Sequence, residues 1–238
     1  MTGKCFFRTL KRKWIGFNQI GTVAIMMLLL GLLSGCAASR SSLTGIYNGP
    51  AERNLGAGKV SVLFLLRHMQ QQHGFDSIPK LQDREVKDFN NLFRDSLTEI
   101  SNISQYTTFL ESPNDVNVPK RRQELEGFRN SHDFTVEITS FEESSFKQQA
   151  LSGTISLLSL TIIPMPYSWD YTITANLLNQ KGQLIRSYQR KATLNNWVEV
   201  FLIFAYPFYP LEGAREQIYI MALHDIFRQI EAEKVLAK

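Results

Sequence analysis

The chain has 238 residues, of which 44% are hydrophobic and 20% are charged, a composition typical of a globular protein. This composition disfavours both a wholly disordered chain and a multi-pass membrane protein. The formal net charge of +4 would point to nucleic acid or an acidic surface if the basic residues were spread evenly. They are not, because five of the 26 basic residues precede residue 14: Lys4, Arg8, Lys11, Arg12 and Lys13.

The first 36 residues have the pattern of a targeting segment. A basic start followed by an uncharged run over residues 14–36 is typical of a secretory signal, although the run is also long enough for a transmembrane anchor. The end of the run favours the signal, because Leu33, Ser34, Gly35 and Cys36 resemble the lipobox of bacterial lipoproteins. The resemblance implies that residues 1–35 are a signal peptide removed by cleavage before Cys36.

The same resemblance implies a lipid anchor, with diacylglycerol on the sulfur of Cys36 and an acyl chain on its new amine. Residue 37 is Ala. In enterobacterial lipoproteins Asp at this position retains the protein at the inner membrane, so for a Gram-negative host the resemblance implies that a chain with Ala37 is exported to the outer membrane. We therefore expect a protein anchored to the outer membrane and facing the periplasm.

Cleavage would change both the charge and the thiol content of the chain. Without the five leading cations, 21 basic residues stand against 22 acidic ones, a formal charge of −1. A nucleic-acid partner is then not expected. Cys5 would leave with the signal and Cys36 would carry lipid, so no thiol would remain for a disulfide, a metal site or a nucleophile.

The mature chain divides into a tether and a single domain. Residues 36–58 are rich in Ser, Gly, Asn and Ala, which predicts a flexible lipidated tether, and residues 59–238 are expected to form one α/β domain. In that domain the apolar run 60–66 predicts a central strand. Apolar residues spaced by three and four predict a helix over residues 83–102. A strand over 106–110 and a helix over 119–129 follow.

The second half of the domain predicts strands and a final helix. Alternating polar and apolar residues predict a strand over 134–139, and residues 169–178 and 183–194 predict a hairpin that turns at Gly182. A long helix is expected over 212–235. The fold class is therefore α/β (α+β), with a mixed sheet in the order strand, helix, strand, helix, strand, antiparallel hairpin and C-terminal helix. By element order and compartment it resembles the α/β domain of the curli-secretion lipoprotein and of the amino-terminal domain of the Tol-system propeller protein.

Two apolar segments, 148–169 and 198–211, flank the predicted hairpin; the first is uncharged throughout and the second is uncharged from Val200 onward. Because hairpin strands are antiparallel, both segments should leave the sheet at the end opposite Gly182. Their apolar and aromatic side chains are candidates for contact with a membrane or a partner. The candidates are Ile162, Ile163, Tyr167, Trp169, Trp197, Phe201, Phe204, Tyr206 and Phe208.

These segments admit several interpretations. In the first interpretation both segments belong to the core, 148–169 as a strand or buried turn and 198–211 as a short helix. In the second they form an exposed apolar surface that enters the bilayer or docks a partner. They could also wall a cavity for lipid or another hydrophobic ligand. The curli-secretion resemblance adds a further alternative, in which inserted strands assemble into an oligomeric secretion channel.

The sequence offers little catalytic chemistry. His68 and His73 would lie on opposite faces of a strand, so no metal site is expected. No Gly-x-Ser-x-Gly motif occurs, and the basic cluster Lys120-Arg121-Arg122 is expected to be a solvated helix face. We therefore predict a non-catalytic envelope lipoprotein without a cofactor apart from its covalent lipid. It would act as an assembly or accessory factor, with an envelope protein or a second copy as possible partner.

Overall fold

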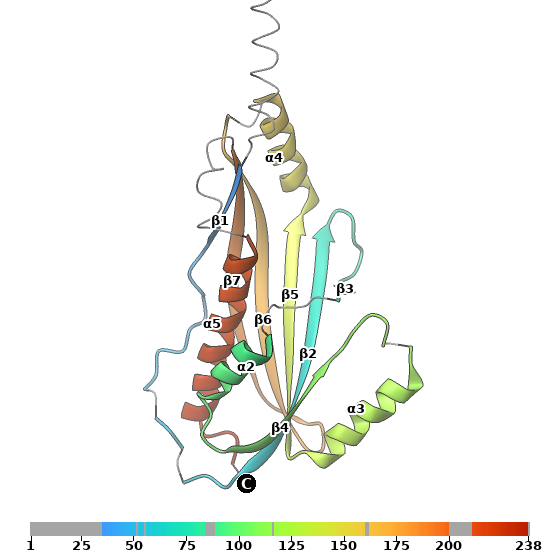
Figure 1. Ribbon diagram of the computed structural model, residues 1–238, viewed down its shortest axis with the longest axis vertical. Helices are drawn as coiled ribbons and strands as arrows, with labels where there is room; N and C mark the ends of the chain where they lie inside the picture. The colour runs from blue at the N-terminus through green and yellow to red at the C-terminus, as the bar shows by residue number, and fades with distance from the viewer. Residues whose placement is uncertain are drawn as a thin grey trace, which may run out of the picture.

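The computed structural model describes residues 35–50, 52–54, 56–83, 89–115, 117–159, 162–199 and 211–237. They form a seven-stranded mixed sheet with helices on both faces (Figure 1). In chain order the elements are β1 (Gly35–Arg40), β2 (Val60–His73), β3 (Lys80–Leu81), α2 (Phe89–Leu97), β4 (Ile103–Leu110), α3 (Pro119–Ser131), β5 (Phe134–Ser145), α4 (Phe146–Leu158), β6 (Met165–Asn179), β7 (Leu184–Glu199) and α5 (Leu211–Ala232).

The sheet has the order β1-β7-β6-β5-β2-β3, and β4 also pairs with β2. β2 is parallel to β4 and β5, whereas β5, β6, β7 and β1 pair antiparallel in turn. The crossovers of the first half therefore give parallel strands, and the hairpin adds antiparallel ones. The predicted α/β class and the hairpin are confirmed, with Gly182 at a positive φ of 75° in the turn.

The core lies on both faces of β2, as its unbroken apolar sequence predicts. On one face Phe64 packs against Phe93 of α2 and Phe227 of α5, with ring centroids 5.0 and 5.6 Å away. The opposite face carries a smaller cluster in which Leu63 and Leu65 are covered by residues of α3. α5 contributes most helical core residues, and its long run along the sheet fixes β6 and β7 beneath it (Figure 1).

The expected flexible tether differs from the structure. Residues 35–40 form β1, an edge strand paired with β7, and Leu43 is buried in the core. Strand pairing uses main-chain groups, so a Ser- and Ala-rich segment can join a sheet without an apolar pattern. The segment leading to the domain is therefore part of its fold.

Two further expectations are corrected. The uncharged segment 148–169 is neither a single strand nor a buried turn, because α4 occupies its first part and β6 begins at Met165. The helix expected over 83–102 is described over Phe89–Leu97, with residues 84–88 outside the described residues. In the first segment, Pro164 lies in the connection between α4 and β6, and proline does not continue a helix because it lacks an amide hydrogen.

Candidate membrane-facing end of the sheet

One end of the sheet gathers the start of β1, the end of β7 and the start of β6. The register places Cys36 opposite Val198, and Val198 opposite Met165. We call this end, together with α4 and residues 162–164, the α4 end. It is the narrow end of the molecule, and α4 stands on it above the end of β5 (Figure 1). Cys36 thus lies at the same end of the sheet as the start of β6, which belongs to the first uncharged segment.

α4 is packed with its polar side inward. Its two fully buried residues are Ser152 and Ser156, and the hydroxyl of Ser152 donates a 2.9 Å hydrogen bond to the carbonyl oxygen of Pro166. Gly153 lies near the phenol oxygen of Tyr167. Small residues bring the helix close to β6, and there the hydroxyl of Ser152 has a main-chain acceptor.

The leucines of α4 lie on the opposite, outer side. Leu151, Leu157 and Leu158 are 61%, 75% and 80% exposed. Ile162 and Ile163, in the connection to β6, are also exposed. A globular helix normally turns its apolar stripe toward the core. The exposed surface of the α4 end therefore carries several large apolar side chains where water would favour polar ones.

The described part of the first segment bears on the interpretation that it is core. Ile162 and Ile163 are 61% and 51% exposed, so these two residues are not core. Residues 146–158 form the helix α4. Phe201, Phe204, Tyr206 and Phe208 of the second segment lie outside the described residues.

The structure brings the three predicted aromatic residues of the hairpin to this end. Tyr167, Trp169 and Trp197 are all half-buried. The indole nitrogen of Trp197 donates a 3.0 Å hydrogen bond to the hydroxyl of Ser39 on β1, and Trp169 packs against the main core. Aromatic rings that are apolar on one side and polar on the other suit the boundary between water and lipid.

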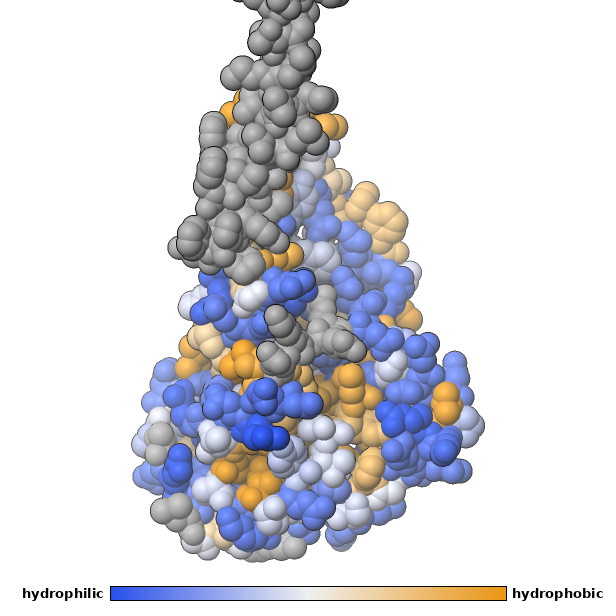
Figure 2. Space-filling model, in the orientation of Figure 1, coloured by the Kyte–Doolittle hydropathy of each residue, from blue (hydrophilic) through white to orange (hydrophobic). Residues whose placement is uncertain are grey.

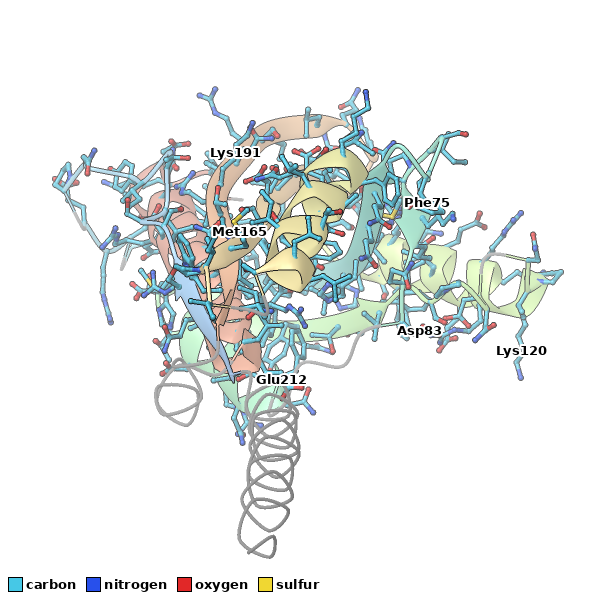
Figure 3. All side chains as sticks on the ribbon, turned by 90° about the horizontal axis from the view of Figure 1, so that it is seen from above. Phe75, Asp83, Lys120, Met165, Lys191 and Glu212 are labelled. Carbon is cyan, nitrogen blue, oxygen red and sulfur yellow. The ribbon has the colours of Figure 1, made fainter. Side chains whose placement is uncertain are left out.

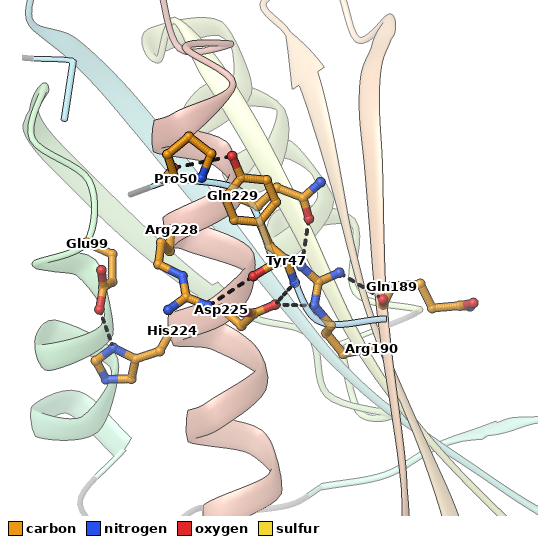
Figure 4. A network of polar contacts seen from close by, with 9 residues as sticks. All are labelled: Tyr47, Pro50, Glu99, Gln189, Arg190, His224, Asp225, Arg228 and Gln229. Carbon is orange, nitrogen blue, oxygen red and sulfur yellow. Dashed lines mark hydrogen bonds and ion pairs between the residues drawn. The ribbon is translucent and has the colours of Figure 1, made fainter. Parts of the chain in front are cut away.

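The segment after β1 is held to α5 by buried carboxylates (Figure 4). Asp225 accepts a 2.6 Å hydrogen bond from Nε of Arg190 on β7 and a 3.0 Å hydrogen bond from the backbone N–H of Tyr47. Glu231 accepts a 2.7 Å hydrogen bond from the backbone N–H of Asn54. A buried charge needs such partners, so these bonds fix the path of the chain between Cys36 and the domain.

Beside this network is a cleft of about 370 Å³. Leu43, Ile46 and Met221 line its apolar part, and Arg228 and His224 lie at its charged side. His224 is within 3.3 Å of Asp95 and 3.0 Å of Glu99, so the charges of the cleft pair with one another. Because these charged groups of the cleft are paired with groups of opposite sign, the cleft does not indicate whether it would bind an anion or a cation.

No group of three metal-binding side chains occurs among the residues that the structure describes. Within the same residues, no helix is long and apolar enough to span a membrane. His73 pairs with Glu143 at 3.1 Å. Arg121 of the basic cluster pairs with Glu124 and lies over the ring of Phe109, 4.3 Å from its centroid. The cluster therefore contributes to the packing of α3 as well as to its solvated surface.

The outward leucines of α4 are the functional candidates that sequence reasoning missed. Apolar residues at positions 151, 157 and 158 alternate with Ser152, Gly153 and Ser156, and the two sets lie on opposite sides of a helix with 3.6 residues per turn. That spacing predicts a helix with one apolar face and one face of small residues. It does not predict which of the two faces is buried.

No model of a known protein family matches the chain, and no curated protein matches its sequence. Among solved structures the chain is similar to a PelC dodecamer from Paraburkholderia phytofirmans, at 9% identity and a TM-score of 0.28, over 81% of this chain and 97% of that one. A second PelC dodecamer from the same organism, carrying one substitution, gives 8% identity and a TM-score of 0.29 over 79% and 96%. At these scores the likeness is a weak resemblance of fold and establishes no family.

Proposed function

We propose that the chain is a lipid-anchored envelope lipoprotein that acts from the periplasmic face of the outer membrane as a non-catalytic assembly or accessory factor. In this proposal Cys36 carries the lipid, and the α4 end rests against the bilayer. The observation that carries it is the coincidence of the lipobox cysteine with an apolar, outward-facing surface at one end of the sheet.

The register of β1 supports this arrangement. Cys36 stands opposite Val198 in the sheet, so acyl chains on it would begin within a few residues of Met165 and α4. The buried contacts of Tyr47 and Asn54 hold the following segment against α5. The anchor would therefore hold the α4 end close to the membrane instead of letting the domain move on a long tether.

The outer face of α4 supports a lipid contact energetically. Moving one leucine side chain from water into an apolar medium is worth about 1.5–3 kcal/mol. Leu151, Leu157 and Leu158 all keep most of their surface in water in the isolated chain. Membrane contact would recover this free energy, and an amphipathic helix beside acyl chains adds to the binding that they provide.

The anchor is tested by mass spectrometry of the mature protein expressed in a Gram-negative host. We expect an N-terminus at residue 36 that carries diacylglycerol and an additional acyl chain, and a Cys36→Ser variant that keeps its leader and carries no lipid. An unprocessed N-terminus or a free thiol at Cys36 in the unmodified chain would contradict the proposal.

The membrane contact is tested separately with vesicles of phosphatidylethanolamine and phosphatidylglycerol. In a chain of residues 36–238 that carries Cys36→Ser and so lacks both the apolar leader and the lipid, replacing Leu157 and Leu158 with Asp should weaken vesicle binding at least about tenfold, because two apolar contacts are lost. Leu184→Asp is the matched control, since Leu184 is an exposed leucine beside the hairpin turn at the opposite end. Equal binding of the two variants would remove α4 from the proposal.

A further inference from the structure

A second apolar projection lies beside the base of α4. The loop of residues 74–79 joins β2 to β3, and it carries Phe75 and Ile78, which are 69% and 70% exposed. Single exposed apolar residues are ordinary on protein surfaces. Here, however, two of the most exposed large side chains of the described structure occur within four residues of one turn.

The loop is held in a defined shape by polar groups that point inward. Gly74 adopts a φ of +99°, a conformation that favours glycine. The side chain of Asp76 accepts a 2.9 Å hydrogen bond from the backbone N–H of Gln72 and pairs with Lys80 at 2.5 Å. The hydrogen bond from Lys80 and that from the Gln72 backbone lower the pKa of Asp76. The carboxylate is therefore used within the loop, and the apolar side chains face out.

The loop is continuous with the apolar surface of α4. The ring of Phe75 meets the ring of Phe146, the first residue of α4, edge to face with centroids 4.7 Å apart. Gln72 donates a 2.8 Å hydrogen bond to the side chain of Gln149. Seen from above, α4 lies between Phe75 and Met165 (Figure 3). On the face shown in Figure 2, apolar atoms reach the surface over the tip of β2 and the adjoining end of α4.

We infer that the loop of residues 74–79 is a second membrane-insertion element, which places Phe75 and Ile78 in the same bilayer that α4 contacts. This inference rests on the proposed function, because it takes the α4 end as the membrane-facing end. The loop lies at the base of α4, beside Phe146, whereas Leu157 and Leu158 lie at the other end of the helix, and two separated contacts would fix the tilt of the sheet on the membrane. A single lipid anchor would leave that tilt free.

The charges around the loop favour a bilayer over a protein partner. Lys147 is exposed at the start of α4, and the carboxylate of Asp76 is mostly covered and paired with Lys80. A lysine such as Lys147 beside an apolar projection suits anionic headgroups, because its stem covers apolar surface and its ammonium group reaches phosphate. At the base of the loop the side chain of Glu143 is paired with His73.

The test uses the mature lipidated protein, residues 36–238, in vesicles of phosphatidylethanolamine and phosphatidylglycerol. Cys5 leaves with the signal peptide and acylation blocks the thiol of Cys36, so an Ile78→Cys substitution supplies a single site for an environment-sensitive fluorophore. We expect the emission to shift to the blue on membrane binding and to be quenched by nitroxide-labelled lipid. The same label at Leu184→Cys, an exposed leucine at the opposite end, should show neither change.

A label at residue 78 that stays in water on bound protein would overturn the inference. So would a blue shift that lipid nitroxide does not quench and that grows with protein concentration, because it would mean contact with a second copy. If Cys36 were not acylated, its free thiol would also react with the fluorophore, and the mass spectrum would show this label. Failure of the lipid anchor is therefore distinguishable from failure of the inference about the loop. A Phe75→Ser, Ile78→Ser variant should also bind vesicles about tenfold more weakly than the Leu184→Ser control.

Discussion

Two helices of this protein, α4 and α5, pack on the same sheet in opposite ways. α5 buries Ile218, Leu223, Ile226, Phe227 and Ile230 and makes the core on one face of the sheet. α4 buries two serines and leaves its leucines in water. α5 thus follows the rule that apolar faces turn inward, and α4 reverses it. The leucines of α4 therefore contribute little to the packing within the chain, and this is why we propose that they contact the membrane.

The largest expected difference between the two helices is in the free energy of unfolding. Leu223 is 1% exposed on α5, and Leu157 is 75% exposed on α4. Leu223→Ala should cost about 2–5 kcal/mol, because it leaves a cavity in the core. Leu157→Ala should stay within about 0.5 kcal/mol of the unmodified chain, as surface substitutions do. Urea denaturation followed by circular dichroism measures both values.

A cost above about 2 kcal/mol for Leu157→Ala would mean that the outer face of α4 is covered in solution. The comparison between the helices would then fail, and α4 would be a core helix.

The contrast also explains which parts of the structure could be predicted from sequence. The unbroken apolar run of β2 predicts a strand buried on both faces, and it is one. The hairpin and α5 follow from turn chemistry and from a long apolar stripe. On α5, however, Met221 is partly exposed and Glu231 is buried, because Glu231 accepts hydrogen bonds from backbone that is distant in sequence. Because these hydrogen-bond partners of Glu231 are distant in sequence, no local sequence pattern predicts that Glu231 is buried.

The candidate site was predictable only in part. The first apolar segment can be recognised in the sequence, and the exposed Ile162 and Ile163 lie in that segment. β1 could not be predicted, because its pairing is through main-chain groups. The outward orientation of α4 could not be predicted either, since periodicity defines two faces without saying which one is buried. Phe75 and Ile78 sit in a turn, where no periodicity exists.

The inner face of α4 offers a second, smaller test. Ser152 is 3% exposed, and its hydroxyl is bonded to the carbonyl oxygen of Pro166. Ser152→Leu should destabilise the protein by about 1–3 kcal/mol, although leucine favours helices, because the added atoms have no space against β6. Thr154→Leu is the matched control on the exposed side and should change the stability by less than about 0.5 kcal/mol. A neutral Ser152→Leu would show that α4 is only loosely placed on the sheet.

The last expected effect is absent near neutral pH, where the preceding stability measurements are made, and should arise on the α5 side at alkaline pH. Burial raises the pKa of Tyr219 on α5, and burial together with a hydrogen bond to Glu233 raises that of Tyr188 on β7. The folded state therefore favours the neutral phenols. Their contribution to stability is complete below the unfolded pKa of about 10 and is lost as pH rises toward the folded values.

Above about pH 10 the free energy of unfolding should fall by up to about 1.4 kcal/mol per pH unit for each tyrosine, as urea midpoints at successive pH values would show. Tyr219→Phe keeps the ring and removes one titrating group, so it should lessen the alkaline loss. Leu157→Ala should leave that loss unchanged, because it alters only the exposed side of α4. If the free energy of unfolding of the Tyr219→Phe chain fell as much at alkaline pH as that of the unmodified chain, Tyr219 would not cause the pH dependence. The α5 side would then not be the part of the fold on which stability depends at high pH.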